Sequence, residues 1–308
     1  MAEYLKPLRD RKEILTFARY LRENHPRPER RTTGPFVERM QSVDSSNFEL
    51  TVPFGASHMT LACIKENPDI AILKRLLIVA PSGKSIDVLA HLGISEDVRI
   101  ELSLDRTDGP GYSVKSNGSK VLRTDAIDSP ETLAVFLHEV GHEAQEDDPL
   151  LQRLQEGVYG YASMIPLEEQ WRNLVEYLEA HGLAGPVQTL KSRLLKNKWY
   201  ARMRALRTYI IERDAVRRAL ESMRDIEDAV GCDIGMNTPV SHADTLYSYI
   251  FGHAGTDGRE KSFSPREQAT LPLRAYCAKS LSLRGVLKEF DENDAVWEVI
   301  FRLSSYDR

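Results

Sequence analysis

The sequence predicts an α+β fold in which a small, mostly antiparallel sheet precedes a helical half of the chain. Alternating apolar residues over 48–52 and 98–104 are typical of strands with one buried face. Residues 111–124 have the pattern of a β-hairpin. From about residue 128 to residue 230, apolar residues recur at helical spacing instead. Strands followed by a run of helices define the α+β class.

The remaining segments are assigned in chain order. Residues 8–24 have helical spacing and are followed by a Pro- and Arg-rich linker at 25–31. Between the two predicted strands, residues 70–78 and 86–92 fit either structure, and helix is favoured in both. After residue 230, one helix is expected near 242–252, and the last 40 residues are predicted to be helical again.

The hairpin at 111–124 is predicted from its centre. Asn117-Gly118 suits a two-residue turn because both central positions of that turn take positive φ, which Asn and Gly tolerate. The flanking segments, Gly-Tyr-Ser-Val-Lys-Ser and Ser-Lys-Val-Leu-Arg-Thr, have the usual length of strands. An edge strand of this hairpin is a candidate for holding an extended peptide by backbone pairing.

The order of elements divides the chain into three parts. We expect an N-terminal helical segment and linker at 1–45, a main domain at 46–230, and a loop-rich and helical extension at 231–308. Neither internal repeats nor low-complexity segments interrupt this order. A chain of 308 residues is long enough to bury a core of its own.

Composition and charge exclude several classes of protein. Hydrophobic residues make up 42% and charged residues 28%, as in water-soluble globular proteins, and no apolar run approaches the length of a membrane span. A net charge of −5 gives no overall attraction to nucleic acid or to an anionic membrane. Cys63, Cys232 and Cys277 fit neither a disulfide framework nor a metal-binding pair, and no signal peptide is visible. A cytoplasmic protein is therefore expected, and its oligomeric state is not indicated.

The segment His138-Glu139-Val140-Gly141-His142 carries the chemistry. Two histidines four residues apart project from the same side of a helix, one turn apart, and together they can bind one metal ion. Glu139 lies beside them, where it can take a proton from a metal-bound water. A catalytic zinc ion uses three protein ligands and a water, so His138 and His142 are two ligands of a predicted site for one Zn²⁺ per chain.

The residues around this motif predict a well-formed helix. Asp128 and Glu131 fit a capping box at its start, with Pro130 in the first turn. An apolar stripe at helical spacing and two small residues beside the ligands follow, namely Leu133, Phe136, Leu137, Val140, Ala134 and Gly141. Two histidines and a glutamate within an apolar stripe are not typical of a solvated surface.

The third ligand must come from another segment. One option is Asp148, ten residues after His138, in the pattern HExxHxxGxxH. Gln145 replaces the glycine that turns the chain in that pattern, which weakens this option. The other option is a glutamate on a later helix, with four candidates: Glu168, Glu169, Glu176 and Glu212.

Glu212 is preferred among these candidates because of its helix neighbours. Small residues lie three, four and seven positions from it, namely Ala205, Thr208, Ala215 and Ala219. Two helices can approach closely over such a surface, as a metal shared between helices requires. Around Glu169 and Glu176 the neighbours are polar, which is typical of a solvated face. Asp148 and Glu168 remain open as alternatives.

Leu137-His-Glu-Val-Gly-His142, with Glu212-Arg-Asp-Ala215 on a later helix, resembles the gluzincin branch of the zincins, the HExxH zinc metallopeptidases. The nearer comparison is with the soluble ImmA/IrrE-like metallopeptidases. In that family a strand or hairpin precedes HExxH, and the third ligand is the glutamate of an E-x-x-A pattern. The resemblance covers residues 111–143 and 210–219. It implies a zincin-like domain with zinc bound by His138, His142 and Glu212.

The resemblance and the chemistry of zinc imply a peptidase mechanism. Zinc lowers the pKa of its bound water and polarises the scissile carbonyl. Glu139 takes the proton of that water as a general base and then passes it to the leaving amine as a general acid. The expected partner is a protein or peptide substrate, and no membrane partner is expected.

Two other functions stand as alternatives. One is a metal-binding regulatory or interaction protein on the same scaffold without proteolysis, against which the presence of Glu139 argues. The other is a nucleic-acid-associated protein, because the segment 191–207 has no acidic residue and includes Trp199 and Tyr200. Its basic residues are Lys191, Arg193, Lys196, Lys198, Arg202, Arg204 and Arg207. The apolar residues of that segment form a packing face, so a solvated helix is favoured and nucleic acid is not expected as a partner.

Overall fold

The computed structural model describes residues 42–43, 46–103, 111–114, 117–155, 165–181, 200–232 and 234. These residues divide into two compact units, one with residues 42–143 and 217–234 and the other with residues 144–216. We call them the sheet unit and the helical unit. Cys277 and the helices expected at 8–24, near 242–252 and over the last 40 residues lie outside the described residues. The division of the chain after residues 45 and 230 stays a prediction.

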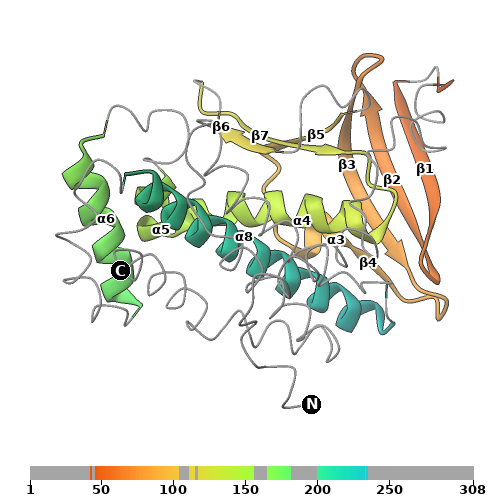
Figure 1. Cartoon of the computed structure of the whole chain (residues 1–308). Coiled ribbons are helices and arrows are strands. Elements are labelled where there is room, and N and C mark those ends of the chain that lie inside the picture. The colour runs from red at the N-terminus through yellow and green to blue at the C-terminus, as the bar shows by residue number, and fades with distance from the viewer. Residues whose placement is uncertain are drawn as a thin grey trace, which may run out of the picture. The chain divides into compact units, whose positions relative to one another are not determined.

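The sheet unit contains a seven-stranded sheet within the described residues (Figure 1). In chain order the strands are β1 Asn47–Phe54, β2 Ser57–Lys65, β3 Ile70–Val79, β4 Ser85–Asp87, β5 Val98–Ser103, β6 Gly111–Val114 and β7 Lys120–Asp125. They are arranged β1-β2-β3-β5-β7-β6, with β4 paired to β3. All pairings are antiparallel except that of β5 with β7. A mixed sheet followed by helices confirms the α+β class in the described part of the chain.

The first strands of the sheet bury every second residue, as strands with one covered face do. The buried residues are Leu50, Val52 and Phe54 in β1, and Ser57, Met59, Leu61 and Cys63 in β2. The strands predicted at 48–52 and 98–104 are confirmed as β1 and β5. β2 is a strand that was not predicted.

β3 is a strand where a helix was favoured, so the prediction for residues 70–78 is wrong. In β3, Leu73 pairs with Cys63 of β2 and Arg75 pairs with Ala62, so Lys74 between them is an extra residue in β3. Such a bulge moves all later side chains to the opposite alternation. The positions that face the core accordingly change from odd to even numbers, from Ala71 and Leu73 to Leu76 and Ile78. The resulting apolar pattern has no single period of two along the segment.

The hairpin of β6 and β7 is confirmed, but its predicted two-residue turn is wrong. Val114 pairs with Lys120, so residues 115–119 connect the two strands. The side chain of Asn117 accepts a hydrogen bond from the backbone N–H of Ser119 at 3.1 Å. Asparagine often forms this side-chain turn with the residue two positions later, and here it lengthens the connection.

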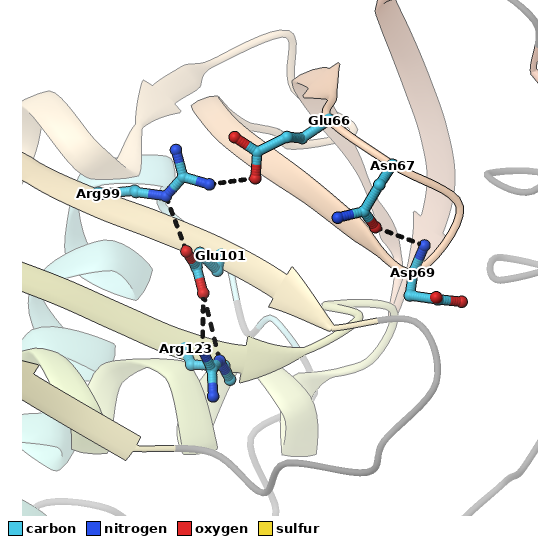
Figure 2. Close-up of polar contacts among 6 residues, drawn as sticks. All are labelled: Glu66, Asn67, Asp69, Arg99, Glu101 and Arg123. Atoms are coloured by element: carbon cyan, nitrogen blue, oxygen red, sulfur yellow. Dashed lines mark hydrogen bonds and ion pairs between the residues drawn. The ribbon is translucent and has the colours of Figure 1, made fainter.

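A buried carboxylate on β5, Glu101, is held by two arginines, one on the same strand and one on β7 (Figure 2). Arg99 donates to one carboxylate oxygen at 2.7 Å, and Arg123 donates to the other at 3.0 and 3.2 Å. Arg99 also pairs with Glu66, which follows β2. Burial acts to raise the pKa of Glu101, but the hydrogen bonds from Arg99 and Arg123 outweigh it and hold that pKa below its usual value.

We expect the Glu101→Gln variant to be less stable than the wild type at neutral pH by about 2 kcal/mol, because hydrogen bonds to charged groups contribute on the order of 1.5–3 kcal/mol. The pKa of Glu101 is lower in the folded chain than in the unfolded one. Its contribution is therefore present above the unfolded pKa and is lost as the pH falls through the folded pKa. Urea unfolding should show the difference shrinking below about pH 4. Glu49→Gln, at an exposed position of β1, is the control, and a difference unchanged by acid would contradict this account.

The helices carry the second half of the described chain. They are α3 Val88–His91, α4 Pro130–Ala144, the 3₁₀ turn η2 Gln145–Asp147, α5 Pro149–Gln155, α6 Leu167–Ala180 and α8 Tyr200–Val230. Within the described residues, the helices predicted from residue 128 to 230 are confirmed, and α3 accounts for part of the helix favoured at 86–92. No helix in the described part of the chain is both long and apolar enough to span a membrane.

A fully buried arginine joins three helices of the helical unit. Arg207 on α8 donates to the side-chain oxygen of Gln170 on α6 at 2.9 Å. It also donates to the carbonyl oxygens of Arg153 and Leu154, near the end of α5, at 3.3 and 2.5 Å. These carbonyls are among those that a helix end leaves without a partner inside the helix. Arg207 is therefore a buried structural residue and not part of a solvated basic surface.

Candidate metal centre

The helix that carries the histidine motif, α4, begins at a cap one residue later than predicted. The hydroxyl of Ser129 accepts from the backbone N–H of Thr132 at 3.2 Å, and the hydroxyl of Thr132 accepts from the N–H of Ser129 at 2.9 Å. This is a capping box between Ser129 and Thr132; the side chain of Glu131, half of the predicted pair with Asp128, lies outside what the structure describes, so that pair stays a prediction. Pro130 explains the shift, since proline is favoured directly after the cap residue, where no N–H is needed.

One face of α4 is buried, as its apolar stripe predicts. Leu133, Phe136, Leu137 and Val140 are all buried, and so are the small residues Ala134 and Gly141. At the end of the helix, the ammonium group of Lys120 on β7 lies 3.2 Å from the carboxylate of Glu143. These contacts fix α4, and with it the two histidines, within the sheet unit.

The two histidines of α4 turn their rings toward one point. The Nε2 atoms of His138 and His142 are 3.1 Å apart, and the ring planes are nearly perpendicular, at 85°. At this distance one Nε2 can donate a hydrogen bond to the other, or both can bind one cation. His138 is 4% exposed, whereas His142 is only half-buried. His138 is therefore enclosed by the protein, whereas His142 is partly accessible to solvent.

The carboxylate of Glu212 lies close to the two imidazole rings. The ligand atoms of His138, His142 and Glu212 all lie within 4.8 Å of one another, and no other group of this kind is found in the described ranges. Glu212 lies on α8 and is 1% exposed, which excludes a solvent-exposed ion pair with Arg213 or Arg217. The structure thus brings together the two histidines and the glutamate that the sequence favoured as the third ligand.

The other candidate ligands are placed differently. Asp148 accepts hydrogen bonds from the backbone N–H groups of Leu150 and Leu151 at 2.9 and 3.2 Å and so caps the start of α5. Glu168 is exposed in the first turn of α6. Neither belongs to the group of His138, His142 and Glu212.

The donor set fits a transition-metal ion. Two imidazoles and one carboxylate, with a fourth position for water, are typical of catalytic zinc. Tetrahedral zinc with bonds of about 2.0–2.1 Å to two nitrogens would hold them about 3.3 Å apart. The observed 3.1 Å between the Nε2 atoms is close to that separation. The two imidazoles can therefore hold a metal ion with little movement, and the ligand atom of Glu212 lies within 4.8 Å of theirs.

Glu139, the expected proton acceptor, follows His138 directly on α4 and is 4% exposed. A glutamate is almost never this buried unless it has a polar partner or a chemical role.

Of the basic residues in the segment 191–207, Arg207 is buried among helix carbonyls, and the other six basic side chains lie outside what the structure describes. No contact among the described residues favours a nucleic-acid partner.

Comparisons with protein-family models, curated proteins and solved structures found no significant match for this chain. The chemistry of the side chains themselves is therefore the basis for assigning a function.

Proposed function

We propose that this chain is a zinc-dependent hydrolase that cleaves peptide bonds, with His138, His142 and Glu212 as zinc ligands. The observation that carries the proposal is the approach of the two Nε2 atoms to 3.1 Å with the Glu212 carboxylate beside them. Imidazole nitrogens favour zinc over magnesium or calcium, which prefer oxygen ligands only. This set of atoms therefore fits a transition-metal ion, and we propose zinc because two histidines and a glutamate are the usual ligands of catalytic zinc.

A catalytic site is favoured over a structural one by the number and exposure of the ligands. Structural zinc sites use four protein ligands, whereas the group within the described residues offers three. Since His142 is half-buried, solvent can reach the site from its side. When bound, zinc would lower the pKa of a water molecule and polarise a carbonyl group.

Glu139 is proposed as the general base and acid. Its carboxylate follows the first ligand on the same helix and can accept the proton of the attacking water. It can then deliver that proton to the leaving amine nitrogen. Glu139 is 4% exposed, so little bulk solvent competes with the attacking water for its carboxylate.

A peptide substrate is proposed from the resemblance to the gluzincins and from the edge of the sheet. β6 stands at one end of the strand order and pairs only with β7 in the described sheet. An edge strand offers backbone N–H and C=O groups to an extended chain. We infer that a peptide segment can pair with β6 during cleavage.

The test is metal-dependent hydrolysis by the purified full-length chain. We expect one zinc ion per chain and cleavage of a mixed peptide library that a chelator abolishes and added zinc restores. A chain that binds no zinc would overturn the metal site. Zinc binding without hydrolysis of any peptide would instead support the alternative of a metal-binding regulatory protein.

A further inference from the structure

A buried glutamine directly after α4 forms hydrogen bonds with the turn of α8 that contains Glu212. Gln145 is the first residue of η2, three residues after His142, and its side chain is fully buried. Its amide nitrogen donates to the carbonyl oxygen of Ile211 at 2.8 Å and to the carboxylate of Asp214 at 3.1 Å. These acceptors lie on either side of Glu212 in the sequence.

The orientation of this amide is fixed by a further glutamine. Gln155, in the last turn of α5, donates to the side-chain oxygen of Gln145 at 2.7 Å. The amide oxygen of Gln145 is therefore engaged, and its two N–H groups point to α8. A buried polar group with all its hydrogen bonds made specifies one arrangement, because a shifted arrangement would leave donors or acceptors unsatisfied.

We propose that Gln145 is a positioning residue for the third metal ligand. Its hydrogen bonds to Ile211 and Asp214 set how α8 is rotated about its axis and where it lies along that axis. The position of α8 in turn determines where the carboxylate of Glu212 lies. A move of α8 by one residue would rotate Glu212 by about 100° and break both hydrogen bonds. This inference rests on the proposed function, since it concerns the same zinc site.

A purely structural role for Gln145 predicts something different. It would make the variant less stable but would affect zinc binding equally whether or not Glu212 is present. A positioning role acts through Glu212, so its effect on zinc affinity must vanish once that carboxylate is removed. Comparing the substitution in two backgrounds separates these cases.

The experiment measures zinc affinity by chelator competition in the full-length chain. Gln145→Leu is expected to weaken zinc binding by about 10–100-fold, the usual effect of removing a group that orients a ligand. Gln152→Leu, an exposed glutamine on α5, is the matched control and should bind zinc as the wild type does. In the Glu212→Ala background, Gln145→Leu should cause no further loss. With cobalt in place of zinc, its visible spectrum should shift toward that of Glu212→Ala.

The outcomes distinguish this inference from the proposal on which it rests. Wild-type protein that binds no zinc would overturn the proposed function itself. Wild-type zinc affinity in Gln145→Leu, or an equal loss in the Glu212→Ala background, would overturn only the role of Gln145. If Gln145→Leu does not fold, Gln155→Leu supplies the same test, because it releases the amide that Gln155 orients. A loss of zinc affinity is expected there as well, and an unchanged affinity would reject the inference.

Discussion

Replacing Glu139 with glutamine is expected to leave one zinc ion per chain and to lower the rate of peptide hydrolysis by about 10²–10⁴-fold, the contribution usual for a positioned acid or base. Glutamine has nearly the shape of glutamate but cannot take the proton of the attacking water. Zinc retention is expected because Glu139 is not one of the three side chains whose ligand atoms gather. Zinc content and hydrolysis rate should be measured on the same preparation.

Glu143→Gln is the matched control for this substitution. Glu143 lies on the same helix four residues later, and its carboxylate pairs with Lys120 on β7. We expect it to keep both zinc and most of the hydrolytic activity, since a glutamine oxygen can still accept from Lys120. Full activity in Glu139→Gln, or equal losses in both variants, would contradict the role given to Glu139.

Replacing Glu212 with alanine is expected to weaken zinc binding by more than about 100-fold. The loss should exceed the 10–100-fold that follows removal of a group that only orients a ligand, because a ligand itself is lost. Two imidazoles would remain. The measurement is chelator competition, with hydrolysis followed in parallel at saturating zinc.

Glu221→Ala serves as the control for Glu212→Ala. Glu221 lies on the same helix, nine residues later, and pairs with Arg217 at 3.0 Å near the surface. Exposed pairs of this kind contribute little, so zinc affinity should be unchanged. Unchanged affinity in Glu212→Ala as well would reject Glu212 as a ligand and return attention to Asp148 and Glu168.

The fold could be predicted where one local pattern determined the structure. The strands β1 and β5 and the helices from α4 onward follow from a period of two or from helical spacing. β3 could not be predicted, because the bulge at Lys74 moves the core face from odd to even positions and hides the alternation. The hairpin was recognised but not its register, since Asn117 uses its side chain to form a longer connection.

In the candidate site, too, a residue could be predicted only where a local sequence pattern determined its position. His138 and His142 are one helical turn apart, so their meeting follows from sequence alone. Glu212 could be preferred because Ala215 and Ala219 on the same helix are small, and both are fully buried. The role of Gln145 gave no such signal, because its partners lie 66 and 69 residues away. Arg207 belongs to the basic segment 191–207 in the sequence, yet its side chain is buried and donates to a carbonyl oxygen of α5.

The central claim is that His138, His142 and Glu212 hold one zinc ion, and zinc-edge X-ray absorption of the zinc-loaded wild-type chain tests it most directly. We expect a single zinc with two imidazole nitrogens and one or two oxygens at about 2.0–2.2 Å. In the Glu212→Ala variant the imidazole signal should persist while the carboxylate contribution is lost. Zinc bound through sulfur, or a spectrum without imidazole ligands, would contradict the account.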